Sequence, residues 1–130
     1  MSEQNGQYPP LLDTSVLQRL RGEVDDEEGI WKVFVQNYIN ELPLRVERLR
    51  LALTTGDIEG AEDAVLSLQT SSEMIGAVRL AALTLEVQES IYHTEPENTG
   101  TVFPRLAAAQ LRGIYRCAQQ TMDHLQQFLP

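Results

Sequence analysis

The chain has 130 residues, of which 42% are hydrophobic and 22% are charged, so it fits one soluble globular domain and not a disordered segment. Ten lysine and arginine residues against nineteen aspartate and glutamate residues give a formal net charge of −9. This acidic balance lacks the basic footprint of proteins that bind nucleic acids or anionic membranes, so we expect neither partner. No stretch approaches the roughly 18 uninterrupted apolar residues of a membrane-spanning helix.

The N-terminal segment and the single cysteine bear on the cellular compartment. Residues 1–10 are polar, end in Pro9 and Pro10, and lack the apolar core of a signal peptide. We expect them to form a flexible leader ahead of one domain that spans residues 11–130. Cys117 has no second cysteine to pair with, and its place near apolar helical positions predicts a structural thiol. Together these features predict a cytoplasmic protein.

A short helix is the first predicted element. Asp13 to Ser15 offer N-cap side chains, apolar residues follow at helical spacing, and Gly22 should end the helix. In the acidic cluster that comes next, Asp25 or Asp26 could cap the following helix and stabilise its positive end. The run from Asp25 to Gly29 lacks the alternating oxygen ligands and the distal glutamate of a calcium loop, so we expect capping and not calcium binding.

The second helix is predicted to be long, because apolar residues recur every three or four positions. Its buried stripe comprises Trp31, Phe34, Val35, Tyr38, Leu42, Val46, Leu49 and Leu53. Pro43 lies inside this stripe and should bend the helix, because it cannot donate a hydrogen bond to the carbonyl of Ile39. Gly56 then offers a left-handed C-cap and Asp57 a new N-cap, which is typical of a tight turn between antiparallel helices.

Two further helices should form the other half of the core. The third begins near Ile58, and its buried stripe comprises Ile58, Ala61, Val65, Leu68, Ser72 and Ile75. Gly76 marks a turn or a close contact before a fourth helix, whose stripe comprises Leu80, Leu83, Val87 and Ile91. Ser71 and Ser72 have no neighbouring base to activate them, so we interpret both as small packing residues.

A loop and a last helix complete the predicted elements. Thr94 to Thr101 forms the loop, and Pro104 should lie in the first turn of the helix. The apolar stripe of that helix comprises Leu106, Leu111, Ile114, Ala118, Met122, Leu125 and Phe128. Because no strand signal competes, we predict an all-α fold, an antiparallel up-and-down four-helix bundle with a short additional N-terminal helix.

Few residues suggest chemistry of their own. His93 and His124 are the only histidines, and neither has metal-ligand spacing, so we expect surface residues without a catalytic role. On the long helix we expect a solvated mixed face with a Glu41–Arg45 ion pair, and not a phosphate clamp. The charged residues of that face are Glu41, Arg45, Glu47, Arg48 and Arg50. We therefore expect no enzymatic activity, no metal and no cofactor.

The stretch from Val65 to Leu80 resembles the signature of histidine-containing phosphotransfer domains, which reads A-H-x-L-K-G-S, then small and apolar residues, G-A and a later L-E. The matching residues are Leu68, Ser71, Gly76, Ala77, Leu80, Leu85 and Glu86. Upstream, the residues that look like the family's scaffold positions are Leu12, Asp13, Leu17, Leu20, Phe34, Leu42, Pro43, Gly56 and Asp57. The resemblance covers about Leu11 to Ile91 and implies a helical bundle that acts in a two-component phosphorelay.

The chain departs from this family at the positions that carry its chemistry. The phosphoacceptor histidine falls on Leu66, the lysine three residues later on Gln69, and the following glycine on Thr70. In that family the imidazole attacks a phosphoryl group held on a receiver-domain aspartate, and leucine has no atom that could do so. We therefore expect that this chain accepts no phosphoryl group at the family's site.

Helical phase places Leu66 on the outward face of the third helix. The residues that share this face are Glu62, Gln69, Thr70 and Glu73. These five residues form the candidate docking face, and the resemblance implies a response-regulator receiver domain or a histidine kinase as the partner. Leu66 is either a contact residue at its centre or an inert replacement. The sequence favours a pseudo-phosphotransfer adaptor, decoy or inhibitor; the alternatives are a phosphotransfer protein with another acceptor, such as one of the two histidines, and a structural or oligomerising bundle.

Overall fold

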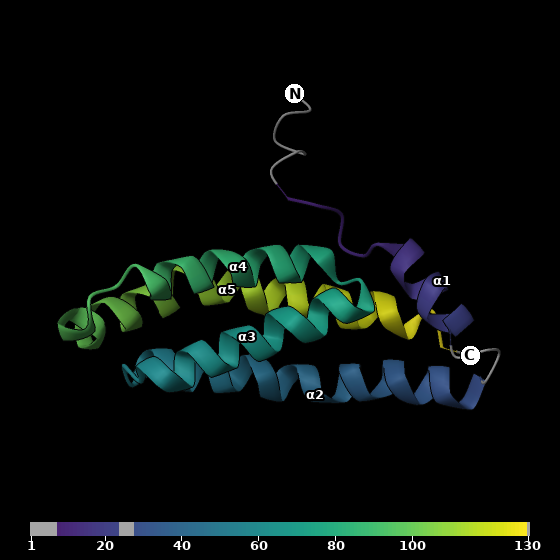
Figure 1. The fold of residues 1–130 in the computed structure, drawn as a ribbon, viewed down its shortest axis with the longest axis horizontal. Helices are drawn as coiled ribbons and strands as arrows, with labels where there is room; N and C mark the ends of the chain where they lie inside the picture. The colour runs from purple at the N-terminus through teal and green to yellow at the C-terminus, as the bar shows by residue number, and fades with distance from the viewer. Residues whose placement is uncertain (1–7, 24–27, 130) are drawn as a thin grey trace, which may run out of the picture.

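The computed structural model describes residues 8–23 and 28–129, which fold into α-helices without any strand. The elements are α1 (Thr14–Glu23), α2 (Glu28–Thr54), α3 (Ile58–Ile75), α4 (Val78–Tyr92), the short 3₁₀ helix η2 (Pro96–Asn98) and α5 (Thr99–Gln126). Four long helices run up and down as a bundle, and α1 lies across one end (Figure 1). The predicted fold class is confirmed. The expected caps at Asp25 or Asp26 lie outside the described residues.

The hydrophobic core lies between the four long helices. α3 packs against α2 and α4, and α5 packs against the same two helices, so α3 and α5 occupy opposite corners of the bundle. Leu17 of α1 is buried against one end of this core. The largest side chains that are almost fully buried are Leu17, Val35, Leu42, Val46, Leu49, Leu53, Leu68, Ile75, Leu80, Phe103, Ile114 and Leu125. Each stabilises the fold by about 1.5 to 3 kcal/mol relative to an exposed position.

The connections on either side of α3 have the backbone geometry that the sequence predicts. Gly56 has a φ of +69°, and the side chain of Asp57 caps α3 by accepting a 3.0 Å hydrogen bond from the backbone N–H of Gly60. At the other end Gly76 has a φ of +86°, and its carbonyl accepts a 2.7 Å hydrogen bond from the N–H of Asp13. Gly76 therefore ends α3 and also binds the segment that leads into α1 through this hydrogen bond.

The last connection differs from the prediction. α5 already begins at Thr99, so Thr99 to Thr101 are helical, and Pro104 lies inside the helix and not in its first turn. Burial of Thr99 and Phe103 extends the helix upstream, while Pro104 removes only one intrahelical donor. Phe128 lies beyond the end of α5 and is 40% exposed, so it is not part of the apolar stripe.

α2 continues through Pro43 as one helix, and the side chain of Pro43 is exposed. The bend that we expect at this residue stays a prediction. None of the helices in the described part of the chain combines the length and the apolar character that a membrane crossing requires.

Tyr8 and Pro9 of the predicted leader contact α4. The hydroxyl of Tyr8 donates to the carboxylate of Glu86, at 2.9 and 3.0 Å from its two oxygens. Arg79 Nε donates to the carbonyl of Pro9 at 3.0 Å. The segment just before Leu11 therefore lies along the bundle, and residues 1–7 lie outside the described part of the chain.

Tyr38 and Ser72 join α2 to α3 inside the core. Their hydroxyl oxygens are 2.8 Å apart, and both residues are buried. Replacing Tyr38 with phenylalanine leaves the Ser72 hydroxyl without this partner and should lower the free energy of unfolding by about 1 kcal/mol at pH 7. Urea denaturation measures this change. The matched control is Tyr92→Phe, at a ring that is 80% exposed, which should change stability by less than about 0.5 kcal/mol.

The buried Tyr38 also makes the stability of the protein depend on pH, and the wild type and Tyr38→Phe are compared to measure this dependence. Burial raises the pKa of Tyr38 to about 12 from its ordinary value of 10.0. Between these two values the unfolded chain releases the phenolic proton while the folded chain keeps it, so stability falls as the pH rises from 10 to 12. This loss, on the order of 2 kcal/mol, should disappear in Tyr38→Phe. Equal alkaline losses in both proteins would contradict the assignment to Tyr38.

Candidate functional site

All five residues of the candidate docking face lie on α3. Leu66 is 52% exposed, Glu62, Thr70 and Glu73 are also exposed, and Gln69 is half-buried. Of the predicted buried stripe on the opposite side of the helix, Ala61, Val65, Leu68, Ser72 and Ile75 are fully buried, and Ile58 is half-buried. The predicted exposure of Leu66 is therefore confirmed. The side-chain oxygen of Gln69 is buried and has no hydrogen-bond partner among the described residues.

A groove of about 800 Å³ runs between α2 and α3 beside Leu66. Leu66 and Thr70 line it, while Glu62, Gln69 and Glu73 lie outside it. Its other lining residues are Arg45, Arg48, Leu51, Ala52, Thr55, Asp57, Gly60, Asp63, Ala64 and Ser67. The groove thus adds an apolar surface bordered by charges to one side of the candidate docking face.

Arg45 connects the two walls of this groove. Its Nε donates to the hydroxyl oxygen of Ser67 at 3.2 Å, and its terminal nitrogen pairs with Glu41 at 2.8 Å. The predicted Glu41–Arg45 ion pair is confirmed, but Arg45 is half-buried against α3 because it reaches the residue next to Leu66. Arg48 is exposed, and no carboxylate among the described residues lies within ion-pair distance of it.

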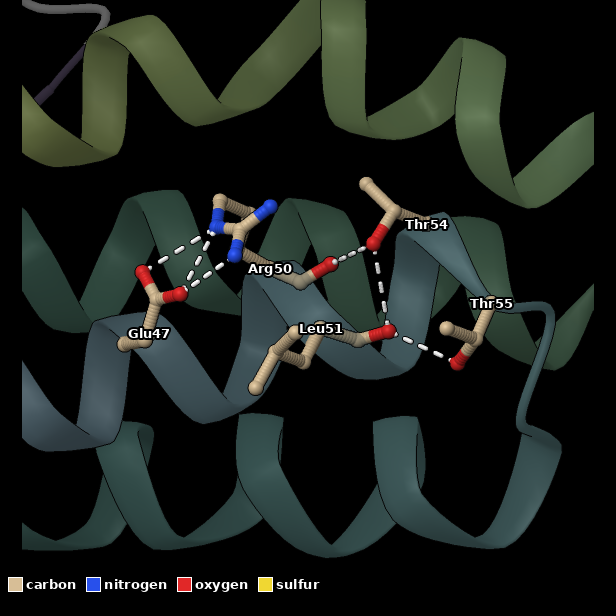
Figure 2. Close-up of polar contacts among 5 residues, drawn as sticks. All are labelled: Glu47, Arg50, Leu51, Thr54 and Thr55. Atoms are coloured by element: carbon tan, nitrogen blue, oxygen red, sulfur yellow. Dashed lines mark hydrogen bonds and ion pairs between the residues drawn. The ribbon is translucent and has the colours of Figure 1, made fainter.

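The Glu47–Arg50 pair does not line the groove, and the side chain of the groove residue Leu51 points away from the pair (Figure 2). Arg50 Nε is 3.0 Å from both carboxylate oxygens of Glu47. This contact lowers the pKa of Glu47 and raises that of Arg50. The end of α2 is fixed separately, because the hydroxyls of Thr54 and Thr55 donate to the carbonyl of Leu51 at 3.2 and 2.7 Å.

The other chemically suggestive residues lie away from α3. His93 is exposed at the end of α4, edge-on to Tyr92, and His124 is exposed in the last turn of α5. Cys117 is buried, and burial raises the pKa of its thiol. No group of three histidine, cysteine, aspartate or glutamate residues in the described ranges could hold a metal ion.

Sequence reasoning missed the groove beside Leu66. It identified Arg45 and Arg48 as members of a mixed face on α2, but it did not connect that face to Ser67 or Asp63 of α3. The short turn at Gly56 could have indicated the groove, because it makes α2 and α3 antiparallel neighbours. Counting outward from that turn places Arg45 and Ser67 at a similar height in the bundle.

The side chains around Leu66 lack the groups that phosphoryl transfer at this position requires. The exposed Leu66 side chain contains only carbon and hydrogen, so it has no nucleophile for a phosphoryl group. The side chains of Gln69 and Thr70 are neutral, so neither residue supplies a cation to offset a phosphoryl anion. What Leu66 and the groove offer instead is apolar area for a partner to bury.

The fold is similar to that of a histidine-containing phosphotransfer protein. The particular likeness is to the crystal structure of histidine-containing phosphotransfer protein B (HptB) from Pseudomonas aeruginosa PAO1, with a TM-score of 0.73. The sequences are 26% identical, and the likeness covers 91% of this chain and 93% of that one. No protein-family model matches the sequence, and no curated protein matches it.

Proposed function

We propose that this chain is a binding module of a two-component phosphorelay, which docks a receiver domain or a histidine kinase without carrying a phosphoryl group. In this role it is an adaptor, decoy or inhibitor and not an enzyme, and it acts in the cytoplasm. The observation that carries the proposal is the exposed hydrocarbon side chain of Leu66, at the position to which the sequence resemblance assigns the reactive histidine of the phosphotransfer family. The likeness to HptB supports the phosphorelay as the setting.

The surroundings of Leu66 support docking. Covering its exposed half gains on the order of 1 kcal/mol, and a partner that also enters the groove would bury Leu51 beside it. Arg48 at the groove adds an exposed cation that can pair with a carboxylate of the partner. If Leu66 were an inert replacement, no apolar residue such as Leu51 and no exposed cation such as Arg48 would be required beside it.

Incubation with a phosphorylated receiver domain tests the loss of phosphotransfer. We expect no acid-labile phosphoryl group on the wild-type chain, because Leu66 has no nucleophilic atom. The variant L66H/Q69K/T70G installs the three residues of the family pattern and should become labelled. The readout is radiolabel on the protein before and after acid treatment.

Two further outcomes would contradict this proposal. Acid-labile label on the wild-type chain that disappears in H93A/H124A would identify a working phosphotransfer protein with a different acceptor. Absence of binding to every receiver and kinase domain of the same genome would instead favour a structural bundle that shares only the fold.

A further inference from the structure

The outward face of α5 carries a stripe of three arginines. Arg105, Arg112 and Arg116 are spaced by seven and four residues, which places them on one side of the helix, and all three are exposed. Among the residues that the structure describes, no carboxylate lies within ion-pair distance of any of them. We call these three residues the arginine stripe.

The distribution of charge along the chain is uneven. No aspartate or glutamate occurs between Asn98 and Met122, the segment that holds the arginine stripe. The rest of the chain therefore contains seven basic and all nineteen acidic residues. Surfaces that serve solubility alone usually intersperse both signs, so a positive stripe on a chain of net charge −9 calls for a different explanation.

The helices beside α5 do not neutralise this stripe. On α2 the carboxylate of Glu47 is paired with Arg50. On α4, Glu86 lines a small pocket together with Gln110 of α5. Its carboxylate accepts a hydrogen bond from the hydroxyl of Tyr8. These two carboxylates thus contact other residues, and neither lies within ion-pair distance of the arginine stripe.

We propose that the arginine stripe is a second interaction surface, which binds a carboxylate-bearing helix of a partner protein. The stripe spans about 16 Å along α5, so glutamates spaced by seven and four residues on a second helix match it. Ala108 and Ala109 are exposed between the first two arginines, and Gly113 has open space around its Cα, so a helix backbone can approach closely.

The same observations argue against other anionic partners. Three arginines neutralise few phosphates, and the net charge of −9 repels a nucleic acid at long range. A lipid surface would require several large exposed apolar side chains beside the cations, whereas Tyr115 is the one such side chain in the described part of α5 and the residues between Arg105 and Arg112 on this face are small. A carboxylate-bearing helix differs from both, because its charge is complementary to the arginines and its shape fits the face of α5 between them.

The arginine stripe and the candidate docking face lie on opposite corners of the bundle, because α5 and α3 each pack between α2 and α4. Both surfaces can therefore be occupied at the same time. Such an arrangement goes beyond the proposed docking at Leu66, since it would let the chain bridge two proteins.

A designed peptide tests the stripe directly. The probe is an alanine-rich helix of about 20 residues with three glutamates at the matching spacing, and its control carries glutamine at those positions. Amide-shift NMR titration of the full chain should show shifts confined to Arg105 to Arg116 with the glutamate peptide only. In R112E/R116E the affinity should fall by about tenfold or more.

The matched variant is R19E/K32E, which makes the same charge change at two exposed cations outside α5 and should bind within about twofold of wild type. Circular dichroism verifies that both variants are folded. An equal loss in R19E/K32E would mean attraction by net charge alone and would overturn the proposal. Shifts of the same residues by single-stranded DNA or phosphatidylserine vesicles, at lower concentration than by the peptide, would also overturn it. Because Leu66 is unchanged in these variants, failure here leaves the receiver-docking test unaffected.

Discussion

Replacing Gly76 with alanine should lower the free energy of unfolding by about 2 to 4 kcal/mol, a large effect for one methyl group. Gly76 has a φ of +86°, a conformation that side chains disfavour. A Cβ at this position would also lie 2.8 Å from the carbonyl oxygen of Asp13 and 3.1 Å from the Cβ of Val16. The substitution therefore strains the end of α3 and displaces the segment that leads into α1.

Gly113→Ala is the matched control, because it adds the same methyl group in the middle of α5, where the new Cβ meets no atom within 4 Å outside the backbone of its own helix. It should raise stability by about 0.5 to 1 kcal/mol, since alanine is the better helix former. Urea denaturation of both variants provides the comparison. Similar stability changes in the two would show that Gly76 does not hold the close contact with Asp13.

Replacing Leu66 with aspartate should weaken binding of a receiver domain by about tenfold or more, while stability changes by less than about 1 kcal/mol. The side chain is 52% exposed on the outer surface of α3, so a charge there stays hydrated in the free protein. In the complex the same charge would replace the apolar contact at the centre of the candidate docking face. Isothermal titration calorimetry and chemical denaturation measure the two effects separately.

Leu68→Asp is the opposite case on the same helix. Leu68 is fully buried two residues away, so the substitution adds an unpaired charge to the core and should cost 5 kcal/mol or more, on the order of the whole stability. A strong loss of stability from Leu66→Asp would mean that Leu66 is a core residue. Unchanged receiver affinity in that variant would make Leu66 an inert replacement.

Much of this fold could be predicted from local patterns. On α3 the spacing of Ala61, Val65 and Leu68 indicates the buried stripe, and the same phase predicts that Leu66 points outward. The turn at Gly56 and Asp57 was predictable because a left-handed C-cap and an N-cap each favour few residue types. In these places local and tertiary preferences agree.

The differences arise where tertiary contacts decide the outcome. The start of α5 depends on burial of Thr99 and Phe103, which outweighs the loop-forming tendency of Gly100. The groove beside Leu66 depends on Arg45 reaching Ser67 across two helices, a contact that periodicity along either helix does not contain. The loss of phosphoryl acceptance at position 66, in contrast, could be predicted from the sequence alone, because the hydrocarbon side chain of leucine cannot accept a phosphoryl group.

An amide-shift NMR titration of this chain with the receiver domains of its own genome, each with and without beryllofluoride, tests the central claim most directly. The account predicts that at least one receiver, or one histidine kinase domain titrated in the same way, shifts residues around Glu62, Leu66, Gln69 and Glu73, and that Leu66→Asp removes these shifts. No shift on α3 with any receiver or kinase domain would contradict it.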